Sequence, residues 1–420
     1  MSVRKKFPMR INTVYIFLFL TIIFFIWVEW YGYGTIEQAF SPPSWVQWIF
    51  HGTLLLLPWG FYYRRKMEKR SQPVRPFSAN FWVGLAISLL ILKWIICLLS
   101  VLHDAGRFSF SMLQVLYPSL PTTSLPYDRL QFLNQGIVIF AGMCIFPMLY
   151  GITRGKYHFK VKHVDLSFKD LPAAFDGYRI AQITDIHAGS FDNVGEVKKG
   201  VDLLKEQDAD MVVFTGDLVN GHKDEIEPFI PSFQGLQAPD GVWCVKGNHD
   251  YYGAYSVKNP EEKNRYWSDF EDKLSRMGFT ILDNAYKVIR RGEAAINLVG
   301  VENWGIGPFP KKGDLDVATS GLAQRFTVLL SHDPSHWDHH IIDHPYHFHL
   351  TLAGHTHALQ FGFKIFGLVW SPVKFRYKRW LGLYKEAEKL LYVNPGFGLL
   401  GFPGRVGMWP EITVFTLRAQ

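Results

Sequence analysis

The chain has 420 residues, of which 48% are hydrophobic, and a formal net charge of +7. Residues 1–155 contain 14 Lys and Arg and 5 Asp and Glu. The totals of 44 and 37 leave 30 Lys and Arg and 32 Asp and Glu for residues 156–420. Because a nucleic-acid-binding protein carries its basic excess on the folded domain, nucleic acid is not an expected partner. The three cysteines, Cys97, Cys144 and Cys244, form no C-x-x-C pair, which argues against a disulfide framework and a zinc finger.

Four apolar segments in residues 1–155 approach the length of about twenty residues that a helix needs to cross a bilayer. They are residues 11–30, 46–63, 81–102 and 130–151. The first contains one charged residue, Glu29, and no A-x-A cleavage pattern follows it, which favours a retained span over a signal peptide. Pro58 and Lys93 are tolerated in membrane helices. The sequence therefore predicts a four-helix transmembrane domain over residues 1–155 and an integral protein of the cell membrane.

The loops between these segments differ in charge. The N-terminus, the loop after the second segment and the residues after the fourth carry twelve Lys and Arg, whereas the opposite loops hold Arg107 and Arg129. Cytoplasmic loops carry the excess of basic residues, so both ends and the large C-terminal domain are expected in the cytoplasm. The assignment depends on the number of spans, because one span more or fewer would invert it.

From about Lys156 the chain changes to short β-rich runs that alternate with amphipathic helical patterns. Strands are expected at residues 178–184, 211–215, 242–246, 296–300, 326–331, 349–353 and 412–417, and helices at residues 194–207 and 261–277. The sequence therefore predicts a globular α/β (α+β) domain over residues 156–420.

Five short polar clusters each follow one of these expected strands, where α/β folds place their ligands. They are Asp185-Ile186-His187, Gly216-Asp217, Gly247-Asn248-His249-Asp250, Ser331-His332-Asp333 and Gly354-His355-Thr356-His357. Their mixed oxygen and nitrogen donors suit manganese, iron or zinc, whereas calcium and magnesium prefer all-oxygen sites. Five such clusters at strand ends are not expected from core packing, since buried unpaired His and Asp are costly.

The spacing within the clusters indicates a site for two metal ions. In extended backbone, residues i and i+2 point to the same side, so Asp185 and His187 can converge on one point, and His355 and His357 can do the same. Asp217 stands alone at the end of another expected strand, where its carboxylate is suited to bridge two cations.

The order D-x-H, G-D, G-N-H-D, a lone His and G-H-x-H resembles the calcineurin-like metallophosphoesterase superfamily over roughly residues 178–417. The run Asn394-Pro395-Gly396-Phe397-Gly398, followed by Arg405 and Pro410-Glu411-Ile412, is similar to the bacterial membrane-associated subgroup of that superfamily. The resemblance implies a two-sheet β-sandwich flanked by helices that hydrolyses a phosphoester bond.

The same resemblance implies the roles of the site residues. One divalent metal is expected on Asp185, His187, Asp217 and His357, and the other on Asp217, Asn248, His332 and His355. Manganese is the expected metal, with iron or zinc as alternatives. The resemblance further implies a metal-bridging hydroxide as nucleophile, His249 as the group that stabilises or protonates the departing oxygen, and Asp250 as the residue that orients His249. Two cations about 4 Å apart lower the pKa of bound water and neutralise charge on the phosphorus oxygens.

The sequence departs from that subgroup after the last candidate ligand. Ala358-Leu359-Gln360 stands where Gly-Gly-Gln is usual, which places larger side chains beside the site. We expect this difference to change the substrate preference and to leave the hydrolytic core unchanged.

Residues 361–384 are rich in both aromatic and basic side chains. Because this combination suits the headgroup interface, the segment is expected to seat the domain on the membrane or to guide a lipid to the metals; alternatively, half of its apolar residues belong to the core. Arg405 has two interpretations, a contact to a substrate phosphate or an ordinary surface arginine.

The expected substrate is a phospholipid or a lipid-linked phosphodiester or pyrophosphate, because tethering raises the effective concentration of bilayer substrates. Soluble phosphodiesters and nucleotides are the alternative substrates. Two alternatives come from other classes: a membrane sensor that binds a phosphorylated ligand without turnover, and a transporter with an accessory hydrolase domain. The complete ligand set and His249 argue against the sensor, and the small number of spans argues against the transporter. Protein partners are not indicated.

Overall fold

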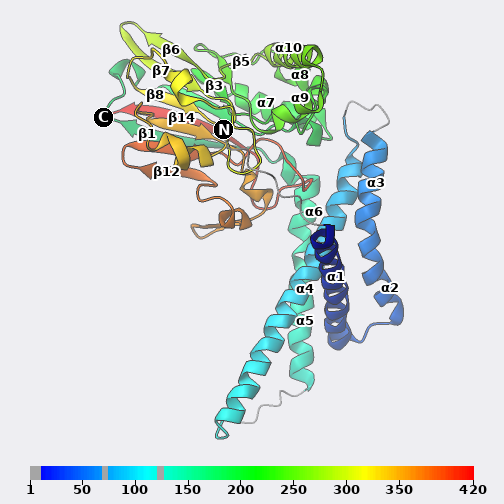
Figure 1. Cartoon of the computed structure of the whole chain (residues 1–420). Helices are drawn as coiled ribbons and strands as arrows, with labels where there is room; N and C mark the ends of the chain where they lie inside the picture. Colours follow the sequence, from blue (N-terminus) through cyan, green and yellow to red (C-terminus); the bar gives the residue numbers. More distant parts are fainter. Residues whose placement is uncertain (1–10, 69–73, 121–126) are drawn as a thin grey trace. The chain divides into compact units, whose positions relative to one another are not determined.

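The computed structural model describes residues 11–68, 74–120 and 127–420 (Figure 1). The chain separates into two compact units. The first comprises the residues up to Tyr62 together with Leu85–Leu149, and the second comprises Tyr63–Gly84 together with Tyr150–Gln420. Residues 63–84 therefore belong to the unit that holds the C-terminal domain, although they lie within the N-terminal part of the sequence.

The first unit is helical. Its helices, some of which continue into the second unit, are α1 (Ile11–Phe40), α2 (Ser44–Gly52), η1 (Thr53–Leu55), α3 (Leu56–Glu68), α4 (Phe77–Leu116), α5 (Tyr127–Met143) and α6 (Ile145–Thr153). Within the described residues, three stretches are long and apolar enough to cross a membrane, namely Phe19–Phe40, Phe77–Leu116 and Arg129–Thr153. They overlap the first, third and fourth predicted spans. The second predicted span corresponds to the short pieces α2, η1 and α3, so the number of four spans stays a prediction.

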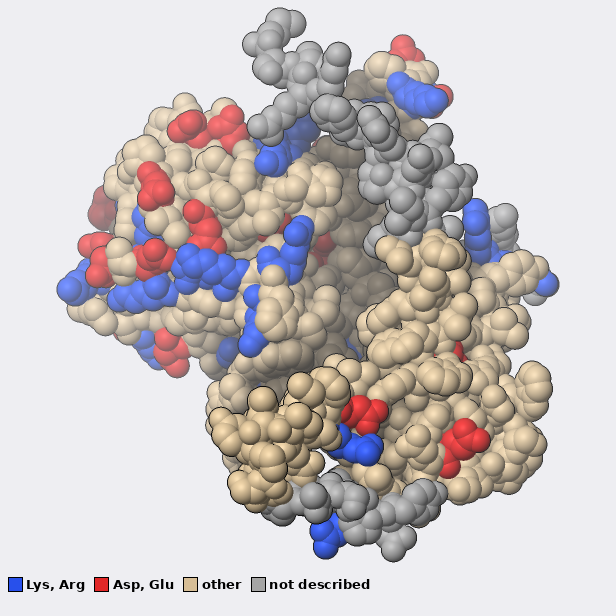
Figure 2. Space-filling view, turned by 60° about the horizontal axis from the view of Figure 1, so that its bottom comes forward, with Lys and Arg blue, Asp and Glu red and all other residues tan. Residues whose placement is uncertain are grey.

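Two ionisable residues of the predicted spans pair with each other. Lys93 Nζ on α4 lies 2.6 Å from Glu29 Oε1 on α1, and the two side chains are 4% and 8% exposed. His51 Nδ1 on α2 lies 2.9 Å from the other carboxylate oxygen of Glu29. Charged residues within membranes are expected to pair in this way. Figure 2 shows broad surfaces with few charged side chains beside a face on which basic and acidic side chains gather.

The second unit is built on two six-stranded sheets and a separate hairpin (Figure 1). The strands are β1 (Lys160–Phe168), β2 (Arg179–Ile183), β3 (Met211–Phe214), β4 (Val242–Cys244), β5 (Thr280–Ile281), β6 (Ala285–Arg291), β7 (Ala294–Gly300), β8 (Thr327–Leu330), β9 (Leu350–Ala353), β10 (Phe363–Ile365), β11 (Leu368–Trp370), β12 (Gly382–Glu386), β13 (Lys389–Val393) and β14 (Glu411–Ala419). The longer helices are α7 (Val194–Lys205) and α10 (Pro260–Arg276), and the shorter ones include α8 (Ile230–Phe233), α9 (Tyr252–Ser256) and α11 (Leu315–Thr319).

Both sheets have parallel strands at their centre. The first has the order β1-β14-β2-β3-β4-β5, and β2 to β5 run parallel. The second has the order β12-β13-β9-β8-β7-β6, and β13, β9, β8 and β7 run parallel. Because parallel neighbours end at the same edge, the residues that follow β2, β3 and β4, and those that follow β8 and β9, are collected at two adjacent stretches of sheet edge.

The central strands are buried on both faces. In β3, Met211 and Val213 belong to the core between the two sheets, whereas Val212 and Phe214 pack with residues of α7 and α10. The outer face of the second sheet packs with α11 and with a π-helical turn at Trp337–Ile341. A strand buried on both faces reads as a continuous apolar run, which is why these strands could be predicted. The predicted two-sheet α/β domain after N-terminal apolar helices is confirmed.

A buried ion pair joins the residues that follow α6 to the loop that follows β2. Lys156 and Asp192 form this pair, and each side chain is 1% exposed. Tyr157 donates its hydroxyl to Asp192 Oδ1 at 2.7 Å, and Asn80 Nδ2 on the first turn of α4 donates to Asp192 Oδ2 at 2.8 Å and to the Ser190 carbonyl at 3.0 Å. The first turn of α4 and residues 156–157 are therefore fixed to one loop, which begins beyond β2.

Candidate metal centre

The seven candidate ligands lie in the loops that follow five parallel strands. Asp185 and His187 follow β2, Asp217 follows β3, Asn248 follows β4, His332 follows β8, and His355 and His357 follow β9. All are buried except His355, which is partly exposed. The two sheets thus bring residues from positions 185 to 357 to one place.

The first group consists of Asp185, His187 and His357, whose ligand atoms all lie within 4.8 Å of one another. His357 Nε2 is 3.3 Å and His187 Nε2 is 3.9 Å from Asp185 Oδ1. The Asp185 carboxylate also accepts the backbone N–H of His355 and the hydroxyl of Thr184, and these hydrogen bonds fix its orientation.

The second group consists of Asp217, His332 and His355, again within 4.8 Å. Asp217 Oδ2 is 3.2 Å from His332 Nε2 in this group and 3.5 Å from His187 Nε2 in the first. One carboxylate oxygen therefore stands between the two groups, as a bridging ligand requires. His332 Nδ1 donates to the Thr215 carbonyl at 2.8 Å, which directs Nε2 toward Asp217.

The backbone of these ligands is unusual. Asp185, His187, Asp217, His355 and His357 all have positive φ, between 46° and 68°. Residues other than glycine rarely adopt this left-handed conformation, and such strain clusters at functional sites. The expectation that the Asp-x-His and His-x-His pairs converge through extended backbone is therefore wrong: β2 ends at Ile183 and β9 at Ala353, and the pairs converge in left-handed turns beyond the strands.

The site has the chemistry that a metal ion needs. Several buried ligand atoms have no hydrogen-bond partner among the described residues: His187 Nδ1 and Nε2, Asn248 Oδ1, His332 Nε2 and His357 Nε2. Unpaired buried polar atoms are rare in folded proteins, and a bound cation would satisfy these. The donor set of carboxylates, imidazoles and one amide fits a divalent transition metal.

The charges of the centre support the same conclusion. Burial alone would raise the pKa of Asp185, but the His357 and His332 imidazoles outweigh it and hold the pKa below its usual range. Burial likewise opposes the ionisation of Asp217, and the neighbouring imidazoles, His332 foremost, hold its pKa well below the ordinary value. Burial lowers the pKa of His187 to about 3. Burial would lower the pKa of His332, but the Asp217 carboxylate outweighs it and raises this pKa to about 10. A bound metal ion would therefore meet ionised carboxylates and take the place of the His332 proton.

Asp250 does not orient His249, contrary to the expectation. His249 Nδ1 is hydrogen-bonded to the Asn220 carbonyl at 2.7 Å. The Asp250 carboxylate instead accepts the backbone N–H groups of Gly247 and Leu218 at 2.8 Å and of Asp217 at 3.0 Å. Burial raises the pKa of Asp250 to about 7, and the Asp217 carboxylate adds to this effect, although the backbone N–H groups oppose it. Asp250 therefore holds together the loops that follow β3 and β4.

Neither expectation for Arg405 holds, because its side chain is buried and contacts the protein's own backbone. Its guanidinium donates to the carbonyls of Pro395, Gly398 and Met408 at distances between 2.6 and 3.1 Å. Its Nη2 also lies 3.4 Å from His357 Nδ1. Arg405 is thus a structural residue that shapes the loop behind the first group.

A cavity of about 320 Å³ opens beside both groups. Asp217, Asn248, His249, His355 and His357 line it, which places His249 on the cavity with the candidate ligands. The rest of the wall is largely apolar or basic and includes Leu359, Pro372, Val373, Arg376, Tyr377 and Leu400. The side chain of Leu359, one of the residues that replace Gly-Gly-Gln, is therefore part of this wall.

Tyr377 is a site residue that the sequence did not reveal. Its hydroxyl lies 2.8 Å from His355 Nε2, and burial raises the pKa of Tyr377 to about 12. Tyr377 and Arg376 belong to residues 361–384, which the sequence linked to a membrane surface. No local pattern distinguishes Tyr377 from the other aromatic residues of this segment, because its role depends on contact with a residue of another loop.

The beginning of the same segment is an exposed apolar hairpin, formed by β10 and β11. The side chains of Phe366 and Leu368 are 104% and 62% exposed, and Ile365 and Phe375 are also exposed. Other apolar side chains of residues 361–384, such as Val373 and Tyr384, are buried or partly buried, so the exposed apolar surface is concentrated in the hairpin. The hairpin is directly followed by the residues that line the cavity.

Comparisons with known proteins agree with this geometry. A family model described as calcineurin-like phosphoesterase matches residues 178–359, and one described as probable calcineurin-like phosphoesterase, transmembrane domain, matches residues 9–156. An uncharacterized metallophosphoesterase of Helicobacter pylori (strain ATCC 700392 / 26695) is 30% identical over 339 residues, which cover 76% of this chain and 82% of that protein. The uncharacterized metallophosphoesterase YkuE of Bacillus subtilis is 29% identical over 59% of this chain and 82% of that protein.

A transmembrane protein with metallophosphoesterase domain from Danio rerio is 29% identical over 279 residues. The match covers 64% of this chain and 60% of that protein, so this chain spans less than two thirds of that relative. The similarity therefore extends from bacterial to vertebrate proteins.

Proposed function

Because this chain belongs to the calcineurin-like phosphoesterase family, we propose that it hydrolyses a phosphoester bond with two divalent metal ions held at the candidate centre. The first ion would be held by Asp185, His187, Asp217 and His357, and the second by Asp217, Asn248, His332 and His355. The observation that carries this proposal is the position of Asp217 Oδ2 between the imidazoles of the two groups. When bound, two such ions lower the pKa of a water molecule and neutralise charge on the phosphorus oxygens.

His249 is the proposed proton donor to the leaving oxygen. A carbonyl only accepts hydrogen bonds, so the contact to Asn220 requires the proton on His249 Nδ1. Nε2 is then the nitrogen that exchanges a proton with the substrate. His249 lines the cavity beside Asp217 and Asn248, where a general acid must lie. Asp250 acts through the backbone of the ligand loops and not on the substrate.

Manganese is the proposed metal, with iron and zinc as alternatives. The donors are carboxylate, imidazole and amide, and no cysteine is among them. Oxygen and nitrogen ligands together suit all three metals, and a metal titration is needed to choose between them.

A phospholipid or a lipid-linked phosphodiester or pyrophosphate is the proposed substrate, and the cytoplasmic side of the cell membrane is the proposed location of the catalytic domain. The helical unit supports attachment to a bilayer. The hairpin with Phe366 and Leu368 presents apolar side chains next to the basic residues Lys364, Lys374 and Arg376, a combination that suits anionic headgroups. The apolar wall of the cavity would contact the part of the lipid next to the phosphate.

The test is hydrolysis of bis-p-nitrophenyl phosphate and of a panel of phospholipids and nucleotides by the full-length protein in detergent, with manganese, zinc, iron or a chelator. Asp217→Asn should lose at least about 100-fold in kcat, because the bridging ligand is removed. Asp165→Asn is the matched control, since its carboxylate lies on β1 and is 69% exposed. Metal binding without turnover of any substrate would favour the phospho-ligand sensor, and turnover of nucleotides alone would favour a soluble substrate.

A further inference from the structure

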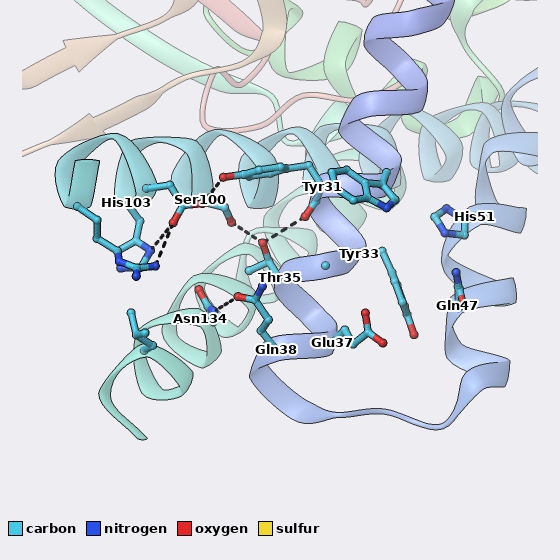
Figure 3. Close-up of a pocket in the computed structure, with 15 residues that line it drawn as sticks. Tyr31, Tyr33, Thr35, Glu37, Gln38, Gln47, His51, Ser100, His103 and Asn134 are labelled. Carbon is cyan, nitrogen blue, oxygen red and sulfur yellow. Dashed lines mark hydrogen bonds and ion pairs between the residues drawn. The ribbon is translucent and has the colours of Figure 1, made fainter. Parts of the chain in front are cut away.

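The helical unit contains a polar cavity of about 350 Å³ that phosphoester hydrolysis does not use. Figure 3 shows side chains from α1, α2, α4 and α5 around it. Five acidic or basic residues line it, namely Glu37, His51, His103, Asp104 and Arg107. Ionisable side chains within membrane helices are costly and usually mark a binding site or a pathway.

The cavity offers charges of both signs. Asp104 Oδ2 accepts a hydrogen bond from the Tyr31 hydroxyl. Its other carboxylate oxygen is 3.7 Å from Arg107 Nη1 and 3.6 Å from His103 Nδ1, and both distances exceed that of a hydrogen bond. The guanidinium and the imidazole therefore keep donors for a ligand. Glu37 has no side-chain partner among the residues that the structure describes.

Uncharged contacts fix the walls of the cavity. Thr35 Oγ1 and Ser100 Oγ, both buried, are 2.8 Å apart and join α1 to α4. Asn134 Nδ2 donates to Gln38 Oε1 at 3.0 Å and joins α5 to α1. Figure 3 shows these pairs together with Tyr33, Glu37, Gln47 and His51, which line the same cavity. The polar groups are thus held in place by contacts between the helices.

We propose that this cavity binds the zwitterionic headgroup of a phospholipid, in which a phosphate and an ammonium group are joined as in phosphoethanolamine. His103 and Arg107 would bind the phosphate, and Glu37 with the ring of Tyr33 would bind the ammonium group. The volume is within the range of about 300 to 1,000 Å³ that is usual for small-ligand sites.

The surroundings of the cavity favour a lipid over a soluble ligand. Trp30, which lines the cavity, and Leu102 on α4 expose 73% and 59% of their surface. Acyl chains can pack on such residues while the headgroup enters the polar cavity. A headgroup with only negative charge fits less well, because Glu37 and Asp104 both contribute carboxylates.

Gly34 provides a way to fill the cavity without changing its charge. It lines the cavity on α1, and a Cβ added there would meet nothing within 4 Å. Leucine also has a higher helix propensity than glycine, so Gly34→Leu should not weaken α1. Gly136→Leu is the matched control, because Gly136 on α5 has equal space and does not line the cavity.

The experiment is native mass spectrometry of the full-length protein in detergent with a chelator, which prevents metal-dependent turnover. The protein is titrated with dioleoyl phosphatidylethanolamine, dioleoyl phosphatidylglycerol, dioleoylglycerol and free phosphoethanolamine. We expect phosphatidylethanolamine to bind best, at least tenfold more weakly in Gly34→Leu, and unchanged in Gly136→Leu. Glu37→Gln should remove the preference for phosphatidylethanolamine over phosphatidylglycerol.

Three results would overturn this proposal. Binding of phosphatidylethanolamine that is equal in Gly34→Leu and the wild type would place the lipid elsewhere, and equal binding of dioleoylglycerol would show that the headgroup is not recognised. Free phosphoethanolamine that binds as tightly as the lipid would make the ligand a soluble compound. Unchanged hydrolysis of bis-p-nitrophenyl phosphate by Gly34→Leu, measured with metal, verifies that the variant is folded.

Discussion

The carboxylate of Asp250 accepts the backbone N–H of Asp217 at 3.0 Å, so one buried acid holds the backbone of another. The same carboxylate accepts the N–H groups of Leu218 and Gly247. The loops after β3 and β4 thereby keep a fixed separation, and Asp217 and Asn248 stay in position for a metal. Asp217 is therefore a candidate metal ligand, whereas Asp250 holds the backbone of the loops that carry the ligands.

Asp250→Asn should weaken metal binding by about 10- to 100-fold, because residues that orient metal ligands contribute that much to affinity. The amide keeps one acceptor oxygen and replaces the other by a donor, which cannot accept the N–H of Asp217. Isothermal titration with manganese measures the affinity. Saturating manganese should restore most of kcat; a kcat that stays low with metal fully bound would instead indicate direct participation in catalysis.

His249→Ala should lower kcat by about 100- to 10,000-fold toward a phospholipid and much less toward bis-p-nitrophenyl phosphate. The reason is that p-nitrophenolate leaves without protonation, whereas an alkoxide needs a proton. Comparison of kcat for the two substrates measures this difference. The manganese affinity is the control and should be unchanged, since His249 is not among the proposed ligands. An equal loss for both substrates would contradict the role as general acid.

Tyr377→Phe should tighten manganese binding about fivefold, because the hydroxyl occupies His355 Nε2 with a hydrogen bond that contributes about 1 kcal/mol. Removal of the hydroxyl leaves this nitrogen available to the metal. The same titration measures the change, with Tyr384→Phe as the control, since Tyr384 donates no contact to a candidate ligand among the described residues. Weaker binding in Tyr377→Phe would mean that the hydroxyl supports the metal-bound state.

Phe366→Asp should reduce hydrolysis of lipid in vesicles about tenfold and leave hydrolysis of bis-p-nitrophenyl phosphate unchanged. Insertion of a phenylalanine side chain into an apolar phase contributes about 1.5 kcal/mol or more, which corresponds to a factor of about ten. Val317→Asp is the matched control, because Val317 on α11 is 58% exposed and is not part of the hairpin. Equal effects of the two substitutions would argue against contact of the hairpin with the bilayer.

Lys273→Met should destabilise the protein at pH 7 and have a smaller effect at pH 3. Lys273 Nζ lies 2.9 Å from Asp224 Oδ1 and 3.0 Å from Asp269 Oδ2. Hydrogen bonds from Lys223 and Lys273 lower the pKa of Asp269. Burial would raise the pKa of Asp224, but the contact with Lys273 outweighs burial and lowers it. A lowered carboxyl pKa stabilises the fold above the unfolded value of about 4, and this stabilisation is lost as the pH falls through the folded value.

The expected loss at pH 7 is below about 1 kcal/mol for each pair, because the carboxylates are exposed to solvent. Urea unfolding at the two pH values measures it, and Lys258→Met at an exposed position is the control. A loss that is equal at both pH values would show that the methylene groups of Lys273, and not its charge, stabilise the contact between α10 and residues 223–229.

The fold could be predicted where strands are buried on both faces. β3 is an uninterrupted apolar run, and β8 is apolar after Thr327. The polar residues that follow both strands were correctly expected to be neighbours. β1, β6 and β12 were not predicted, because these edge strands are largely exposed and carry charged residues among the apolar ones. β13 was also not predicted, although its buried run Leu390–Val393 is as continuous as that of β3.

The details of the metal centre depended on contacts that sequence patterns do not record. The left-handed backbone of His187 and His357 has no signal in residue type, because this conformation usually belongs to glycine or asparagine. The contact between Asp250 and Asp217, the burial of Arg405 and the approach of Tyr377 to His355 each join loops that are distant along the chain. The candidate ligands could therefore be identified from the sequence, whereas the residues that surround them could be identified only from the tertiary structure.

The position of β14 affects how the protein is made. This strand, Glu411–Ala419, lies between β1 and β2 in the first sheet, and it pairs with both (Figure 1). During synthesis, β1 and β2 therefore emerge from the ribosome about 230 residues before the strand that joins them. Until then the sheet has a gap beside the strand that leads to Asp185, so a nascent chain can already insert its apolar helices into a membrane while its hydrolytic centre is still incomplete.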